Sequence, residues 1–166
     1  MNITSSIFED MTRPSFSDLF IDITLLIAQR SPCVKTQQAA LLVKDSRIIS
    51  FGYNGPPAHH LNCVSDGGEA TCGKDVTGSC FMGIHAEQNA IGYAARNGIN
   101  TDGCIVYCTM SPCISCAKLC VASGIKAYFY LKPYRLTEGL DFLLTSGVKT
   151  IELSERFKNK MNSNKC

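Results

Sequence analysis

Three side chains of the sequence have the types and the spacing that bind zinc. His85 stands two residues before Glu87, and Pro112 directly precedes a C-x-x-C motif made by Cys113 and Cys116. Zinc accepts imidazole nitrogen and thiolate sulfur together, and three protein ligands leave a fourth position for water. Zinc brings the pKa of that water near neutrality, and a neighbouring carboxylate can take and return protons. The sequence therefore predicts a catalytic zinc held by His85, Cys113 and Cys116, with Glu87 as the acid–base group.

The upstream H-x-E and the proline make this pattern specific. C-x-x-C by itself also occurs in redox motifs and in structural zinc sites. The full pattern H-x-E…P-C-x-x-C is the signature of zinc nucleobase deaminases. Both ligand groups are expected where helices begin, because Pro112 suits a first turn and the positive end of a helix dipole favours thiolates. The competing interpretations are unrelated core cysteines with a surface histidine, and a Glu87 that only complements a helix dipole.

Four further cysteines precede His85, and three of them lie in a glycine-rich stretch at 58–83 that has little hydrophobic periodicity. A structureless loop of this length is unusual inside a compact domain, so we expect metal to order it. Four thiolates form a closed structural zinc site. Free buried thiols, or His59 or His60 in place of one cysteine, remain as alternatives. The predicted ligands of this second zinc are Cys33, Cys63, Cys72 and Cys80.

Hydrophobic periodicity and turn signals predict the elements that must position these groups. The first helix, from Ser15 or Ser17 to about Arg30, is expected to bury Leu19, Ile23, Leu26 and Ile27. Two mostly buried strands of a hairpin follow at 37–44 and 47–53. The remaining elements are helices at 84–97, 112–123 and 137–146, and strands at 104–109, 127–131 and 149–153. This order predicts an α/β fold, a three-layer α-β-α sandwich around a central mixed five-stranded sheet.

Length and composition favour one domain and exclude several classes of function. The 166 residues predict a single domain at 15–155 with flexible ends at 1–14 and 156–166. A formal net charge of +2 argues against a nucleic-acid-binding surface, and no apolar run is long enough to span a membrane. No basic segment precedes an apolar stretch near Met1, so we expect a cytoplasmic protein. There, ten cysteines indicate metal binding rather than disulfides.

Four motifs carry a resemblance to a known family. They are Gly52-Tyr53-Asn54-Gly55, His85-Ala86-Glu87-Gln88-Asn89-Ala90, Ser111-Pro112-Cys113-Ile114-Ser115-Cys116 and Ala122-Ser123-Gly124-Ile125-Lys126. With them the chain resembles the deoxycytidylate (dCMP) deaminases of the cytidine deaminase superfamily, bacterial and bacteriophage forms included, from about Ser17 to Leu153. The second group of cysteines resembles the structural zinc site of many members, and Tyr134-Arg135 resembles phage versions.

The resemblance implies a cytidine-deaminase-like fold and hydrolysis of dCMP to dUMP and ammonia, which supplies thymidylate synthesis. It also implies a homo-oligomer, commonly a hexamer, activated by dCTP with Mg²⁺ and inhibited by dTTP. Effector contacts are expected from Gly52, Asn54, Gly55 and Asn89. Substrate contacts are expected from Asn54 at the sugar, Ala86 at the base, Ser111 and Arg135 near base and phosphate, and Tyr93.

Two features of the sequence bear on how far this resemblance extends. An asparagine after a strand end can also cap a turn, which is the alternative for Asn54. Gln38-Ala39-Ala40 stands where the family usually has Val-Gly-Ala, which changes the dimensions expected of the pocket.

Two other functions compete with this interpretation. A tRNA adenosine deaminase shares the catalytic motif, but it needs a basic face for RNA and ordinarily lacks the second group of cysteines. A zinc-ordered binding or assembly module with an inactive site leaves Glu87 without a purpose, because ligands alone suffice in a structural site.

Overall fold

The computed structural model describes residues 14–60, 62–63 and 80–153. The predicted flexible ends and most of the 58–83 insertion, including Cys72, lie outside these ranges.

A five-stranded mixed sheet forms the centre of the molecule, in the order β2-β1-β3-β4-β5. β1 is antiparallel to both β2 and β3, whereas β3, β4 and β5 run parallel to one another. The predicted mixed five-stranded sheet is therefore confirmed. The strands are β1 (Ala39–Lys44), β2 (Arg47–Tyr53), β3 (Ile105–Met110), β4 (Ala127–Lys132) and β5 (Lys149–Glu152).

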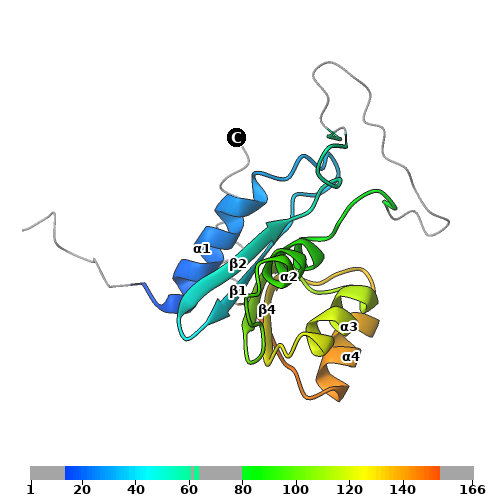
Figure 1. The fold of residues 1–166 in the computed structure, drawn as a ribbon. Helices are drawn as coiled ribbons and strands as arrows, with labels where there is room; N and C mark the ends of the chain where they lie inside the picture. Colours follow the sequence, from blue (N-terminus) through cyan, green and yellow to red (C-terminus); the bar gives the residue numbers. More distant parts are fainter. Residues whose placement is uncertain (1–13, 61, 64–79, 154–166) are drawn as a thin grey trace, which may run out of the picture.

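Helices cover both faces of this sheet (Figure 1). α1 packs on one face, where Phe20 and Ile21 meet Leu41 of β1 and Tyr107 of β3 in one core cluster. The other three helices pack on the opposite face, where a larger cluster gathers small side chains of α2 and α3 with Leu143 of α4. The three-layer arrangement is thus confirmed. The helices are α1 (Phe16–Ala28), α2 (Ala86–Arg96), α3 (Ile114–Ala122) and α4 (Glu138–Thr145).

The predicted buried face of α1 is wrong in part. Leu19 and Leu26 are exposed, by 41% and 63%, whereas Phe20, Ile21 and Thr24 are buried. Apolar residues surround this helix, so their spacing alone does not select one face. The buried Thr24 hydroxyl donates a hydrogen bond to the Phe20 carbonyl, which removes the cost of burying a polar group.

The prediction that both hairpin strands are mostly buried holds for β1 and is wrong for β2. β2 lies at the edge of the sheet, and Ser50 and Gly52 are its buried residues. Phe51 is 52% exposed because α1 packs mainly over β1 and β3. An edge strand is covered on fewer sides than a central one, so the apolar residues in its sequence do not show that the strand is buried.

The other face of β2 contacts the start of α2 very closely. A Cβ atom on Gly52 would lie 2.5 Å from both the Ala86 carbonyl oxygen and the Ala90 nitrogen. One turn of helix therefore rests directly on the strand backbone, which only glycine permits. The Ser50 hydroxyl donates a hydrogen bond of 2.7 Å to the Ala90 carbonyl at the same contact.

A short backbone bridge fixes the chain just before α2. Gly55 and Ile84 exchange two hydrogen bonds, of 3.1 Å and 2.8 Å, in an isolated antiparallel bridge. This bridge holds the residue next to His85 against the end of β2. Among the described residues, no helix has both the length and the apolar character needed to cross a membrane.

Candidate active site

The N-termini of α2 and α3 meet at one place, and each begins with a predicted zinc ligand. His85 is the N-cap of α2 and Cys113 is the N-cap of α3, with Cys116 in its first turn. The His85 Nδ1 atom lies 3.5 Å from Cys113 Sγ and 3.4 Å from Cys116 Sγ. In the described part of the chain this is the one group of three or more candidate ligands that lie within 4.8 Å of one another.

Local electrostatics prepare these three groups for a cation. Hydrogen bonds from Cys116 and His85 lower the pKa of Cys113 to about 4, although burial opposes this. The same contact with Cys113 raises the pKa of Cys116. The hydrogen bond with Cys113 also raises the pKa of His85. One imidazole and two sulfurs at two helix N-termini are a donor set that fits zinc, whose binding displaces the remaining protons.

Glu87 lies beside this group in the first turn of α2. It is buried, with 7% of its surface exposed, and burial raises the pKa of its carboxyl group. The Tyr128 hydroxyl donates a hydrogen bond of 2.9 Å to Glu87 Oε1. A buried carboxyl group held in this way is suited to exchanging protons near neutral pH.

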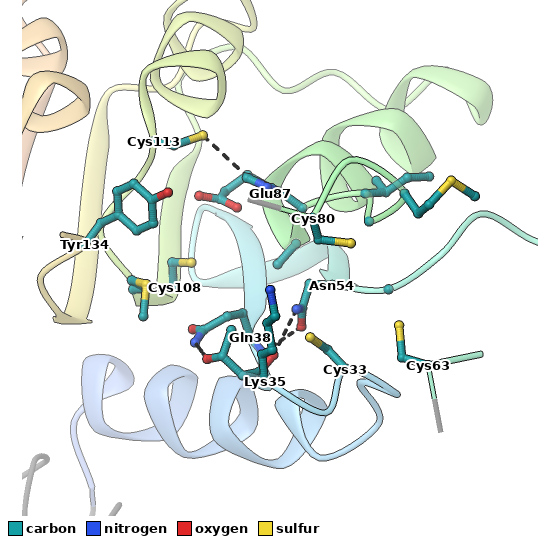
Figure 2. A pocket seen from close by; sticks show the side chains of 18 of the residues that line it. Cys33, Lys35, Gln38, Asn54, Cys63, Cys80, Glu87, Cys108, Cys113 and Tyr134 are labelled. Carbon is teal, nitrogen blue, oxygen red and sulfur yellow. Dashed lines mark hydrogen bonds between the residues drawn. The ribbon is translucent and has the colours of Figure 1, made fainter. Parts of the chain in front are cut away.

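His85, Cys113 and Glu87 border a cavity of about 310 Å³ (Figure 2). Cys116, the third predicted ligand, is buried beside His85 and is not among the residues that line the cavity. Its walls come from the segment after α1, the end of β2, the start of α2, the end of β3 and the segment after β4. Lys35 and Arg135 are its basic residues. Figure 2 shows Tyr134 on the wall opposite Asn54. The cavity therefore combines a buried proton-transfer group with cations at an exposed rim.

The cavity includes some of the predicted contact residues and leaves out others. Asn54, Gly55, Ala86, Ser111 and Arg135 line it. The predicted contacts Tyr93, Asn89 and Gly52 are not among its lining residues. Tyr93 is 53% exposed on α2, and the Asn89 amide donates a hydrogen bond to the Tyr53 carbonyl. The structure thus gives Gly52 and Asn89 packing roles between β2 and α2.

Asn54 serves as a structural tie as well as a wall of the cavity. Its Oδ1 atom accepts hydrogen bonds of 2.8 Å from the Gln38 nitrogen and 2.7 Å from the Ser31 hydroxyl. Its amide nitrogen donates a hydrogen bond to the Thr36 carbonyl at 2.9 Å. These bonds fold the 31–38 segment over the end of β2 and so place Lys35 at the cavity. One amide hydrogen of Asn54 remains for a ligand.

Comparison with known proteins identifies the family of this fold and site. Residues 14–132, more than half of the chain, match the family model described as the cytidine and deoxycytidylate deaminase zinc-binding region. The chain belongs to this deaminase family.

Relatives of this chain include bacterial, phage and eukaryotic proteins. ComE operon protein 2 of Bacillus subtilis (strain 168) is 34% identical over 158 residues, which cover 93% of this chain and 81% of the relative. The deoxycytidylate deaminase of Enterobacteria phage T4 is 32% identical over 177 residues, covering 86% of this chain and 92% of the relative. The crystal structure of the dCMP deaminase from cyanophage S-TIM5, in complex with dCMP and dUMP, aligns with a TM-score of 0.72 and 30% identity, covering 86% of this chain and 99% of that one.

The described cysteines of the second group also line the cavity of this deaminase. Cys33, Cys63 and Cys80 come from the segment after α1 and from the two ends of the insertion. Figure 2 shows Cys33, Cys63 and Cys80 on the same side of the cavity, although their sulfur atoms do not all lie within 4.8 Å of one another. The alternative ligands His59 and His60 are exposed and do not line the cavity. The second zinc stays a prediction, because its fourth expected ligand, Cys72, lies outside the described residues.

Several cavity residues were not predicted from the sequence. Lys35 and Tyr134 line the cavity, and the hydroxyl of Tyr128 in β4 contacts Glu87. Lys35 stands two residues after Cys33. Because Cys33 is a predicted zinc ligand that must approach the insertion, the sequence does give a signal that Lys35 lies near the site. Tyr128 carries no such signal, because it sits within an apolar strand and is indistinguishable there from a core residue.

Gly139 controls how closely α4 approaches the Cys113 ligand. A Cβ atom at this position would overlap the Pro112 carbonyl oxygen and would lie 2.9 Å from the carbonyl carbon of Cys113. We expect Gly139→Ala to push α4 and the start of α3 apart and to weaken zinc binding by about 10-fold or more, as supporting contacts of metal ligands do. Chelator competition measures this affinity.

Gly92→Ala is the matched control for this substitution. Gly92 is also a helical glycine, but nothing lies within 4 Å of a Cβ atom placed there. It should leave zinc affinity unchanged and keep or raise stability, since alanine is the better helix former. Equal zinc affinity in both variants would contradict the role of Gly139.

Proposed function

We propose that this protein hydrolyses dCMP to dUMP and ammonia, with zinc held by His85, Cys113 and Cys116. The observation that carries the proposal is the meeting of these three ligand atoms at the wall of a cavity that the buried Glu87 also lines. Relatives named deoxycytidylate deaminase, in phage T4 and in Mycobacterium phage D29, support dCMP as the substrate. The cyanophage enzyme crystallised with dCMP and dUMP supports it as well.

The reaction adds one water to the carbon–nitrogen double bond of the ring next to the amine, and then releases the amine as ammonia. Bound zinc supplies an activated water as the nucleophile. Glu87 accepts a proton from the attacking water and donates it to the ring nitrogen next to the carbon that carries the amine. It then passes a second proton to the amine, which leaves as ammonia while that carbon becomes a carbonyl. The raised pKa of the buried carboxyl group suits this two-way transfer.

The walls of the cavity divide between the base and the sugar phosphate. Ala86, Cys108 and Met110 offer small or apolar surfaces near Glu87, where a flat pyrimidine ring can enter. Asn54 retains one amide hydrogen for the sugar. Ser111 lines the same region, where its hydroxyl accepts a hydrogen bond of 2.7 Å from the Tyr134 nitrogen.

Lys35 and Arg135 supply the positive charge that a 5′-phosphate needs. Both side chains are exposed and line the cavity, from the segment after α1 and from the segment after β4. The Arg135 guanidinium lies 5.7 Å from the centre of the Tyr134 ring, a cation–π contact that orients it at the rim. Charged hydrogen bonds to phosphate are among the stronger polar contacts, so these residues favour the nucleotide over the nucleoside.

The finer features expected of the family complete the proposal. A second, structural zinc would be bound by Cys33, Cys63, Cys72 and Cys80, and the chain would assemble into a homohexamer. dCTP with Mg²⁺ would activate the enzyme and dTTP would inhibit it. Gly55 and Asn54 of the Gly-Tyr-Asn-Gly motif line the cavity, which supports a contact of this motif with a nucleotide.

Glu87→Gln tests the catalytic assignment, because it removes the acid–base group and keeps the shape of the side chain. We expect deamination of dCMP to fall by at least about 10²-fold. Zinc content should stay at the wild-type value, about two ions per chain, since Glu87 is not a ligand. Ammonia release and metal analysis are measured on the same sample.

The substrate panel for this test comprises dCMP, dCTP, CMP, cytidine and a tRNA anticodon stem. Release from the tRNA stem alone would instead identify an adenosine deaminase. No release from any substrate by the wild type would favour a binding module, and loss of zinc in Glu87→Gln would refute its role beside the metal.

Lys35→Ala tests the phosphate contact. We expect kcat/KM for dCMP to fall by about tenfold or more, because a hydrogen bond to a charged group contributes about 1.5–3 kcal/mol. Turnover of deoxycytidine, which has no phosphate, should stay unchanged. Lys149→Ala, an exposed lysine at the start of β5, is the control. A parallel loss for both substrates would show that Lys35 does not act through the phosphate.

Saturation curves with dCMP test the regulation. We expect cooperative kinetics that dCTP with Mg²⁺ makes hyperbolic and dTTP suppresses, because an effector shifts an equilibrium between two states of an oligomer. Hyperbolic kinetics that respond to neither nucleotide would remove this part of the proposal.

A further inference from the structure

Tyr128 of β4 is a buried polar residue to which the chemistry described above gives no role. Its side chain is completely buried, and its hydroxyl lies 2.9 Å from Glu87 Oε1 and 3.0 Å from the Met110 carbonyl oxygen. Burying a hydroxyl is unfavourable unless it is hydrogen-bonded. The phenol has a single hydrogen, so it donates to one of these two oxygens at a time, and both lie within its reach. The residue therefore joins the centre of the sheet to the carboxylate in the cavity.

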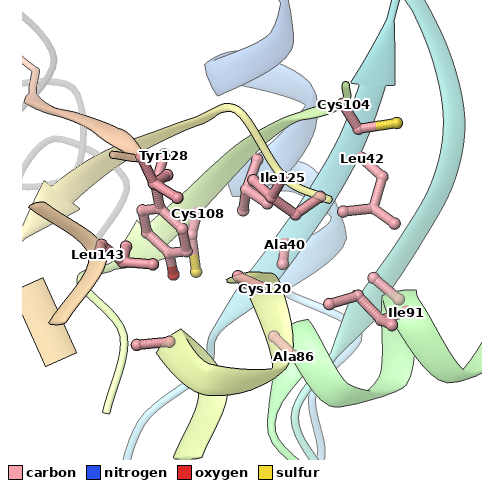
Figure 3. Packing of buried hydrophobic residues seen from close by; sticks show 14 of the residues in the cluster. Ala40, Leu42, Ala86, Ile91, Cys104, Cys108, Cys120, Ile125, Tyr128 and Leu143 are labelled. Atoms are coloured by element: carbon pink, nitrogen blue, oxygen red, sulfur yellow. The ribbon is translucent and has the colours of Figure 1, made fainter. Parts of the chain in front are cut away.

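The position of this hydroxyl is fixed by the sheet and its core. β4 is paired on both sides, with β3 and with β5, and Tyr128 stands opposite Val106 and Thr150. Figure 3 shows its ring between Leu143 of α4 and Cys108 of β3. An aromatic ring that is packed on all sides keeps one rotamer. Its oxygen is therefore a rigid reference point within the core.

Glu87, in contrast, has a side chain with three rotatable bonds at the start of a helix. A carboxylate has two oxygens, and a proton carrier needs one of them directed at the reacting atoms. The carboxyl group is held by the Tyr128 hydroxyl at Oε1 and by the backbone N–H of Glu87 itself, so its rotation is restricted at the cavity that Glu87 lines. Positioning of this kind lowers the barrier because the productive geometry is set before substrate arrives.

We propose that Tyr128 is a positioning residue that fixes the carboxyl group of Glu87 for proton transfer. It acts through Glu87 and does not touch the substrate. This inference rests on the proposed deaminase function, and it adds a role for a residue of the core that the catalytic motif does not contain.

Tyr128→Phe tests the proposal, because it deletes the hydroxyl and keeps the ring that packs in the core. We expect kcat for dCMP to fall by roughly 10- to 100-fold, as for other residues that orient a catalytic group. KM should change by less than about twofold, and zinc content should equal that of the wild type, because binding and metal ligation do not involve the hydroxyl.

Tyr107→Phe is the matched control. Tyr107 is a buried strand tyrosine too, but it faces α1 on the other side of the sheet, where its hydroxyl lies 3.2 Å from the Ser17 hydroxyl. It should cost a similar amount of thermal stability and leave kcat unchanged. A fall in kcat of equal size in both variants, or loss of zinc in Tyr128→Phe, would reduce Tyr128 to a structural role and overturn the proposal.

The double variant separates action through Glu87 from any other effect. Adding Tyr128→Phe to Glu87→Gln should reduce the residual turnover no further, since the group that Tyr128 positions is already inactive. A full additional loss would overturn the proposal. Wild-type turnover with an unaffected Tyr128→Phe would refute the role of Tyr128 alone, whereas a wild type that deaminates nothing would refute the proposed function together with it.

Discussion

The meeting of two helix N-termini is the constraint on which this site depends. His85 and Cys113 are N-caps of different helices and lie 28 positions apart in the sequence. Their ligand atoms come within 3.5 Å because α2 and α3 both pack by small residues, such as Ala90 and Ala117, on the same face of the sheet. The positive ends of both helix dipoles lie at this site, where they stabilise the negative charge of the cysteine thiolates.

Glycines at two contacts let the backbones come close enough for this meeting. Gly52 lets β2 lie directly against the start of α2, and Gly139 lets α4 lie against the segment before α3. The first contact packs against the N-terminus of α2 and the second against the N-terminus of α3. The Glu87 carboxyl group accepts a hydrogen bond from a core residue, Tyr128, which is distant in the sequence. The geometry of the site is therefore a property of the whole α/β layer.

Much of this arrangement could be predicted from the sequence because its signals are local. Turn residues and periodicity located all nine described elements to within a few residues. The H-x-E and P-C-x-x-C motifs identified the group that the structure brings together. The buried face of α1 and the exposure of β2 could not be predicted, because they depend on which strands each element meets. Tyr128 was missed for the same reason, because its partner Glu87 lies 41 positions away along the chain.

The backbone bridge between Gly55 and Ile84 has a consequence for how such a chain can change. Because these two residues are paired, the chain between them forms a closed loop whose ends are anchored beside the first ligand. The entropy of closing a loop grows only with the logarithm of its length, so residues can be added or removed there at small cost. The length of this segment is thereby uncoupled from the placement of His85, whereas Cys63 and Cys80, which line the cavity from its two ends, are not interchangeable with other residues.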